Sequence, residues 1–390
     1  MANSNNTIFV SIASYRDNKC PTTILSCFEK AKNPSLITCG VCQQNKDSDL
    51  DCRHDLIGKT EYIHNVKIIR LKEYEAKGPT HARYLCSTLW DGEGYYLQID
   101  SHTQFEKDWD EKLINMIKVI KEKGLSQKPV LSTYPKNYDD TKDPSHIPRL
   151  CEAMFNERDM ISFKGAVILR KTELPVNTPF MAAGFFFCES KFLNEIPFDP
   201  NLPYLFYGEE IANSARFWTH GWDIFTPNEN AVYHYYTRKD DPKFWDDAKN
   251  YNDKEAFDKI KKLVGLDDNA KIADHLNKNS EKYGMGKVRN LNDYYTFAGI
   301  DIKNKKITHS FCRDNSDGGS IINEIKVEIK NVVNKVKESF SNVFLSSNAQ
   351  SAKDNVGNDI KSSSFIIGIV VVIILLLVVF LYFRKKKMGF

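Results

Sequence analysis

The chain has 390 residues, and its 54 Lys and Arg nearly balance its 51 Asp and Glu, so the formal net charge is only +3. A near-neutral chain lacks the strong positive field that typifies nucleic-acid binding, and we expect no nucleic-acid partner. The length allows one large domain or two ordinary ones, and an aromatic content of 12% favours a folded core over disorder.

The first part of the chain alternates apolar, strand-like runs with helix-like segments. Strands are predicted over residues 7–15, 36–41, 66–71, 95–100 and 130–134. Helices are predicted over residues 21–32, 81–89 and 109–123, the last from its apolar spacing. This alternation predicts an α/β fold with a central, mostly parallel sheet.

The next part is more irregular. Strands are predicted over residues 166–169, 183–189, 223–226 and 231–235. A helix is predicted from residue 207 to about 220, with Glu209 and Glu210 in its first turn. Negative charge is favoured at that end of a helix, so both residues have a structural explanation as well as a functional one.

The C-terminal part predicts a membrane attachment. Residues 319–344 repeat apolar residues every three or four positions, as in a stalk helix, and residues 345–364 form a polar, flexible linker. Residues 365–383 are an apolar run long enough to span a bilayer, and residues 384–390 are a basic tail. Residues 1–318 are then the catalytic domain.

The orientation in the membrane follows from two observations. The basic tail favours a cytosolic C-terminus, and residues 1–7 do not resemble a signal peptide. We therefore expect a single-pass, tail-anchored protein with a cytosolic catalytic domain. The richness in Lys and Asn suggests an AT-rich genome, such as that of an amoeba or a large DNA virus, which is compatible with a viral or host internal membrane.

The nine cysteines are scattered and odd in number. Buried free thiols in a reducing compartment are the favoured interpretation. The alternative is a zinc site built from Cys39, Cys42, Cys52 and His54.

A buried strand ends in an Asp-x-His sequence, Asp100-Ser101-His102. Side chains two residues apart in an extended chain point to the same side, so Asp100 and His102 can converge on one metal ion. One carboxylate and one imidazole with open positions suit a divalent cation bound to a diphosphate. The pattern indicates a nucleotide-sugar transferase.

Several further motifs occur in a recognisable order: residues 8–17, Cys20, residues 78–83 and residues 98–102. In this order they resemble the GlcNAc-transferase family of GT-A fold, over about residues 7–300. That family includes a cytosolic hydroxyproline polypeptide GlcNAc-transferase that modifies a ubiquitin-ligase adaptor, and the polypeptide GalNAc-transferases are more distant relatives. The resemblance implies an enzyme that uses a UDP-sugar donor.

The resemblance also implies roles for individual residues. Asp100, His102 and His234 match the metal ligands, with manganese as the expected ion. Glu209 and Glu210 match the acidic position that faces the acceptor and the sugar, and with Asp100 they are the expected catalytic residues. The expected donor-binding residues are Ser11, Ala13, Tyr15, Arg16, Arg83, Asp100, Ala183, Gly184 and Arg238.

The implied reaction is transfer of GlcNAc from UDP-GlcNAc to a hydroxyl on a protein or a glycan, with retention of configuration. No residue is identifiable as a covalent nucleophile, so a same-face mechanism assisted by the UDP oxygen is the working hypothesis. Two alternatives remain open. One is another UDP-sugar, glucose or galactose, on the same fold; the other is a non-catalytic membrane or virion surface protein.

Overall fold

The computed structural model describes residues 6–140, 143–237, 241–248 and 251–312. The predicted stalk, linker, membrane span and basic tail, and Arg238, lie outside the described residues. Within the described ranges no helix is both long and apolar enough to cross a membrane. Residues Met1–Asp314 belong to one compact unit.

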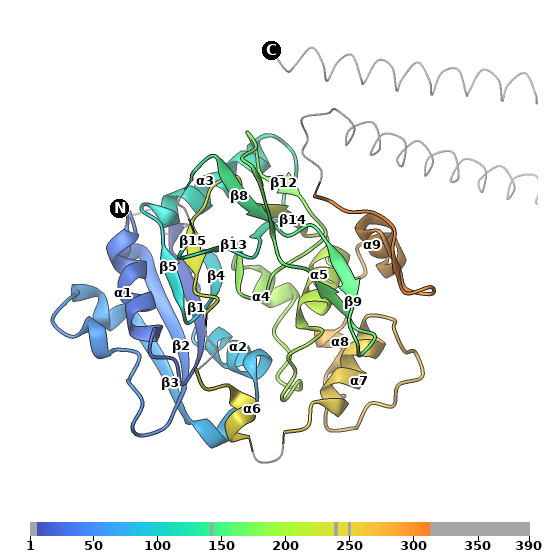
Figure 1. Cartoon of the computed structure of the whole chain (residues 1–390), viewed down its shortest axis with the longest axis horizontal. Helices are drawn as coiled ribbons and strands as arrows, with labels where there is room; N and C mark the ends of the chain where they lie inside the picture. The colour runs from blue at the N-terminus through green and yellow to red at the C-terminus, as the bar shows by residue number, and fades with distance from the viewer. Residues whose placement is uncertain (1–5, 141–142, 238–240, 249–250, 313–390) are drawn as a thin grey trace, which may run out of the picture. The chain divides into compact units, whose positions relative to one another are not determined.

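An eight-stranded sheet forms the centre of this unit (Figure 1). Its strand order is β12-β14-β6-β13-β4-β1-β2-β3. The strands are β1 (Ile8–Tyr15), β2 (Ile37–Asn45), β3 (Val66–Lys72), β4 (Tyr95–Asp100), β6 (Pro129–Ser132), β12 (Val176–Asn177), β13 (Phe185–Glu189) and β14 (Asp223–Thr226). β1, β2, β3 and β4 pair in parallel, as does β6 with β14, whereas β13 is antiparallel to both of its neighbours. The prediction of a mostly parallel α/β sheet is confirmed.

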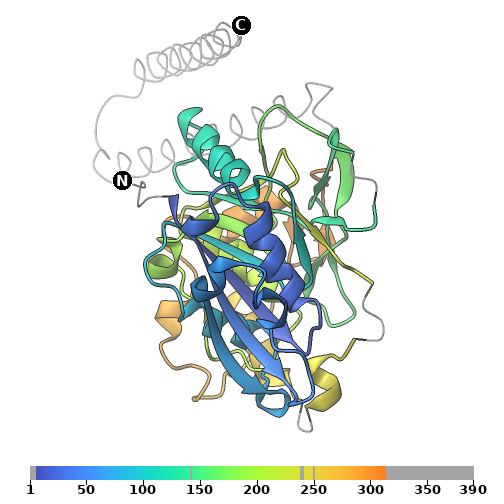
Figure 2. The same cartoon turned by 90° about the vertical axis from the view of Figure 1, so that its left-hand side faces the viewer.

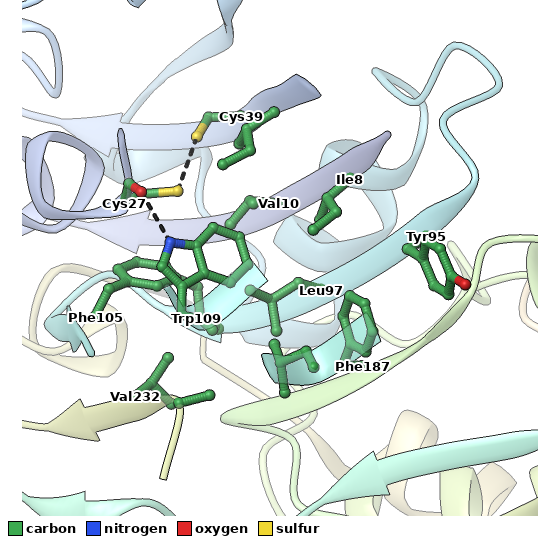
Figure 3. Packing of buried hydrophobic residues seen from close by; sticks show 14 of the residues in the cluster. Ile8, Val10, Cys27, Cys39, Tyr95, Leu97, Phe105, Trp109, Phe187 and Val232 are labelled. Atoms are coloured by element: carbon green, nitrogen blue, oxygen red, sulfur yellow. Dashed lines mark hydrogen bonds between the residues drawn. The ribbon is translucent and has the colours of Figure 1, made fainter. Parts of the chain in front are cut away.

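Helices cover both faces of the sheet (Figure 2). They are α1 (Cys20–Lys30), α2 (Pro79–Ser87), α3 (Trp109–Glu122), α4 (Phe192–Glu195), α5 (Glu209–Thr219), α6 (Phe244–Asp247), α7 (Lys254–Leu263), α8 (Ser280–Tyr283) and α9 (Leu291–Ala298). On β1 the alternation of side chains sends Ile8 and Val10 to the face covered by α1 and α3, and Phe9 to the opposite face. Figure 3 shows Trp109 of α3 in the hydrophobic core on the α1 and α3 face of the sheet. Its indole Nε1 donates to the Cys27 carbonyl at 2.9 Å.

Short strands complete the unit. They are β5 (Thr103–Phe105), β7 (Lys136–Asn137), β8 (His146–Arg149), β9 (Ala153–Phe155), β10 (Ile161–Phe163), β11 (Val167–Arg170), β15 (Val232–His234), β16 (Ile300–Asp301) and β17 (Lys306–Ile307). The strands predicted at 166–169 and 231–235 exist, but they lie outside the central sheet: β11 pairs with β8, and β15 pairs with β5 and β7. β5 follows directly after β4, so its pairing with β15 brings residues 232–234 close to the end of β4.

The cysteines require a correction. Cys151 and Cys312 form a disulfide, although we expected free thiols; the other seven cysteines are free and buried, as expected. The zinc alternative is not formed among the described residues, because Cys39 Sγ lies 3.9 Å from Cys27 Sγ and His54 is exposed beside Asp55.

Candidate active site

A cavity of about 510 Å³ opens where β1 and β4 end. Parallel α/β sheets commonly bind ligands beyond the carboxyl ends of their strands, and this volume is within the range of small-molecule sites. The cavity is lined by most of the residues predicted for the site: Ala13, Tyr15, Arg83, Asp100, His102, Ala183, Gly184, Glu209, Glu210 and His234. Ser11 is fully buried within β1 and is not part of this lining, and neither is Arg16.

The predicted metal ligands converge in this cavity. Asp100 ends β4, His102 follows two residues later, and His234 ends β15. One ligand atom from each lies within 4.8 Å of the others, and Asp100 Oδ2 is 3.1 Å from His234 Nε2. The pairing of His234 with Thr103 across β15 and β5 explains how a residue 134 positions from Asp100 reaches it.

The chemistry of these donors fits a divalent cation. Two imidazoles and one carboxylate form a mixed N/O set that suits several first-row metals. His234 is buried, and its Nδ1 has no hydrogen-bond partner among the described residues, while its Nε2 is directed at Asp100. Burial opposes ionisation of Asp100, but the hydrogen bond from His234 and the charge of Arg83 outweigh it, so the pKa of this carboxyl lies well below its usual range. Asp100 is therefore an anion ready to bind a cation.

Arg83 of α2 connects the metal-ligand group to the acidic residues. Its Nη2 donates to Asp100 Oδ1 at 3.1 Å, and its Nη1 donates to Glu209 Oε2. The arginine is only 6% exposed; its pair with Glu209 is buried, and its pair with Asp100 is partly buried. We expected Arg83 to face a nucleotide phosphate; in this structure its guanidinium is instead shared by two carboxylates.

Glu209 and Glu210 begin α5 but have different environments. Glu209 is paired with Arg83, and burial raises its pKa although the arginine opposes this. Glu210 accepts hydrogen bonds from the Tyr134 hydroxyl and from the Ala183 amide, the latter at 2.9 Å. Burial raises the pKa of Glu210 to about 7 despite these donors. Of the two, Glu210 can hold or release a proton near neutral pH.

Gly184 has a clear steric reason to be glycine. It lies just before β13, and a Cβ placed on it would be 2.8 Å from Asp100 Oδ2. We expected Ala183 and Gly184 to leave room for the donor sugar. The structure shows that Gly184 also leaves room for the carboxylate of Asp100.

Tyr15, which lines the cavity, belongs to a hydrogen-bonded cluster around Asp247 of α6. Asp247 Oδ2 accepts from the Tyr15 hydroxyl at 2.6 Å and from Arg16 Nη1 at 2.9 Å, and Lys46 Nζ is 3.0 Å from Oδ1. Arg16 Nε also donates to Asp49 at 2.9 Å. The hydrogen bond from Tyr15 and the neighbouring cations lower the pKa of Asp247 to about 2. Arg16 is therefore engaged by two carboxylates rather than directed into the cavity.

Sequence reasoning missed several residues of this site. Aromatic side chains from two segments line the cavity: Phe206, Tyr207, Phe244 and Trp245. Phe206 and Trp245 lie with ring centroids 5.6 Å apart, and both are more than 40% exposed. The available signal was the Phe244-Trp245 pair in an otherwise polar segment, because exposed aromatic clusters often mark binding sites. Phe206 and Tyr207 follow an apolar run and gave no such signal.

Tyr134 and Asp17 were missed as well. Tyr134 follows a predicted strand with no motif around it, and only the fold brings it to Glu210. Asp17 accepts a hydrogen bond from His102 at 2.8 Å. It follows the end of the first strand closely, but nothing in its spacing connects it to a histidine 85 positions away.

Comparison with solved structures supports the fold. A structure of GalNAc-T7 with UDP, GalNAc and Mn²⁺ is 15% identical, with a TM-score of 0.50, and the match covers 74% of this chain and 56% of that one. The chain thus spans just over half of GalNAc-T7. A 1–349 fragment of S. aureus TarS in complex with UDP-GlcNAc is 14% identical with a TM-score of 0.40, covering 75% and 73% of the two chains.

Comparison with sequences identifies the family. No curated protein matches the chain. The family model described as Glycosyltransferase (GlcNAc) matches residues 7–63 and 58–304, which is most of the chain and contains every residue that lines the cavity. The chain therefore belongs to the GlcNAc glycosyltransferase family and is a glycosyltransferase with a GT-A-like α/β fold.

Proposed function

We propose that this protein is a metal-dependent, retaining glycosyltransferase that moves GlcNAc from UDP-GlcNAc to a hydroxyl on a protein or a glycan. The observation that carries the proposal is the convergence of Asp100, His102 and His234 in the same cavity as Glu209 and Glu210. This convergence supports the proposal, because three side chains able to hold a cation and two acidic residues surround one volume large enough for a small-molecule donor.

Manganese is the proposed ion, held by Asp100, His102 and His234. When bound, a divalent cation would neutralise charge on the diphosphate as UDP leaves. GalNAc-T7 was solved with Mn²⁺ and UDP together, which supports this choice.

We assign donor binding to Ala13 and Tyr15 at the end of β1, with Arg83 across the cavity and Ala183 and Gly184 beside Asp100. The Tyr15 hydroxyl donates to Asp247, so its ring is held in one orientation at the cavity wall. A fixed aromatic ring at this position offers a flat surface to a nucleobase. Ser11 and Arg16 do not line the cavity, so we do not assign them a direct contact with the donor.

The acidic residues favour a same-face reaction. Glu209 is neutralised by Arg83, and the Glu210 carboxyl is held by Tyr134 and the Ala183 amide. A double displacement needs a carboxylate that is free to attack the anomeric carbon. We therefore propose that Glu209 and Glu210 orient the sugar and the acceptor, and that the acceptor proton passes to the departing UDP oxygen. Trapping a glycosyl adduct on either residue would contradict this assignment.

The membrane attachment remains a proposal from the sequence. Residues 365–383 are proposed to anchor the enzyme, so its acceptor is proposed to be a membrane-associated or surface protein or glycan. Carbonate extraction of membranes from expressing cells tests the anchor, because a variant lacking residues 365–390 should leave the membrane fraction.

The function is tested by UDP release from a panel of UDP-sugars, with and without Mn²⁺, using the full chain. We expect turnover of UDP-GlcNAc that requires Mn²⁺ and is lost in Asp100→Asn. Asp110→Asn is the control, because Asp110 is an aspartate that does not line the cavity and instead accepts the backbone N–H groups of residues 32 and 33. Equal turnover in wild type and Asp100→Asn would refute the proposed site, and preference for UDP-glucose or UDP-galactose would change the donor only.

A further inference from the structure

The environment of His102 contains a buried carboxylate that the proposed chemistry does not use. Asp17 lies in the loop between β1 and α1, and its side chain is completely inaccessible to solvent. Its Oδ2 is 2.8 Å from His102 Nδ1 and accepts a hydrogen bond from the Ser101 hydroxyl at 2.7 Å. An aspartate is costly to bury without partners, so this placement needs a reason.

The hydrogen bond to Asp17 determines which nitrogen of His102 carries the hydrogen and which carries the lone pair. A carboxylate accepts hydrogen bonds, so Nδ1 of His102 must carry the hydrogen that faces Asp17. In the neutral imidazole the lone pair is then on Nε2. His102 lines the cavity, and its ring is 4.5 Å from that of His234. Because Nδ1 faces the carboxylate of Asp17, we take Nε2 as the atom that His102 offers to the metal-ligand group.

Other contacts fix Asp17 and the turn that carries His102. The Lys19 amide donates to Asp17 Oδ1 at 2.9 Å. Thr23 of α1 donates its hydroxyl to the Ser101 carbonyl at 2.8 Å and accepts from the Thr103 amide at 3.0 Å. The start of α1 thus supports the Asp-x-His turn from one side, while β15 pairs with β5 on the other (Figure 1).

We propose that Asp17 is a positioning residue that holds His102 in the tautomer and orientation needed to bind the metal through Nε2. This inference rests on the proposed metal site. Metal-binding histidines commonly donate their second N–H to a carboxylate, and loss of such a partner typically weakens metal affinity by about 10- to 100-fold. Asp17 is then part of the site without touching the metal, the donor or the acceptor.

The informative substitution is Asp17→Asn, which preserves size and the oxygen facing the Lys19 amide. The new amide group can present N–H to His102 Nδ1, which would then act as an acceptor and place the hydrogen on Nε2. That tautomer cannot bind a metal through Nε2. A role limited to folding would change stability but would not change the tautomer.

Two measurements on the full chain test the proposal: Mn²⁺ affinity by titration calorimetry, and the His102 tautomer by ¹⁵N NMR in the absence of metal. We expect Nδ1–H in the wild type, a shift toward Nε2–H in Asp17→Asn, and Mn²⁺ affinity lower by about 10- to 100-fold. Asp110→Asn should keep the wild-type affinity. Asp17→Glu, which retains a carboxylate, should bind Mn²⁺ more tightly than Asp17→Asn if both variants fold.

The outcomes separate this inference from the proposed function. Wild type that binds no Mn²⁺ would overturn both the metal site and the role of Asp17. Wild type that binds Mn²⁺, with unchanged affinity and tautomer in Asp17→Asn, would overturn the role of Asp17 alone. An Asp17→Asn variant too unstable for titration leaves the Nδ1–H tautomer of the wild type as the test, and an Nε2–H wild type would overturn the proposal.

Discussion

Replacing Gly184 by alanine tests the geometry of the site most directly. The added Cβ would lie 2.8 Å from Asp100 Oδ2 and 3.4 Å from its Cγ. Non-bonded heavy atoms pack at about 3.5 Å or more, so the carboxylate must retreat by roughly 0.7 Å. Metal–ligand distances are satisfied only within about 0.2 Å, so Asp100 should no longer complete the site.

The expected result of Gly184→Ala is Mn²⁺ affinity lower by at least about tenfold, because a primary ligand is displaced. The free energy of unfolding should fall by about 1–3 kcal/mol, the usual cost of overpacking. Titration calorimetry measures the affinity, and urea denaturation measures the stability. UDP release measured at saturating Mn²⁺ concentration shows whether activity returns once the weakened site is occupied.

Gly165→Ala is the matched control, because a Cβ at Gly165 meets no atom within 4 Å among the described residues. It should leave Mn²⁺ affinity and UDP release unchanged. Wild-type Mn²⁺ affinity in Gly184→Ala would refute the reasoning, since it would mean that Asp100 either is not a ligand or can move without cost.

Three further predictions concern charge and covalent structure. Arg83→Met should lower the free energy of unfolding by about 3–5 kcal/mol, because it leaves the buried carboxylate of Glu209 without its cation and removes a donor from the partly exposed Asp100. Arg70→Met, which breaks an exposed ion pair, should cost less than about 1 kcal/mol in urea denaturation, and equal losses in the two variants would contradict the assignment. The pKa of Glu210 is raised from 4.5 to about 7, so between these pH values the folded state retains a proton that the unfolded state releases, and the free energy of unfolding should fall as the pH rises from 4.5 to about 7. Glu210→Gln should lose this pH dependence, and identical stability–pH profiles of wild type and variant would contradict the raised pKa. Cys151→Ser should lower stability by about 2–5 kcal/mol by opening the bond to Cys312, and reductant should destabilise the wild type but not the variant in thermal scans.

The elements that carry local patterns could be predicted from the sequence. β4 begins and ends at the predicted residues 95 and 100, and the Asp100-x-His102 spacing brought both side chains to one site as the extended geometry requires. His234 was found through family resemblance and not through spacing, because only the pairing of β15 with β5 brings it to Asp100.

The parts of the site that could not be predicted depend on contacts between distant segments. Asp247 reaches Tyr15 over 232 positions and thereby separates Arg16 from the cavity. The elements α6, α8, β16 and β17 contain only two to four residues each, which is too short to show a hydrophobic repeat that would predict a helix or a strand. The disulfide was missed for the same reason: 161 positions separate Cys151 from Cys312, and pairing cannot be deduced from scattered cysteines.

The disulfide has a mechanical consequence. Cys312 is the last described residue, and its sulfur is bonded to Cys151, whose carbonyl accepts from the Phe311 amide at 2.9 Å. A pulling force applied to the chain beyond residue 312 would therefore enter the domain through a covalent bond at Cys151. The two-residue strands β16 and β17, which follow α9, would be shielded from peeling. Reduction would transfer that load to their few hydrogen bonds and make this end of the domain the first to detach.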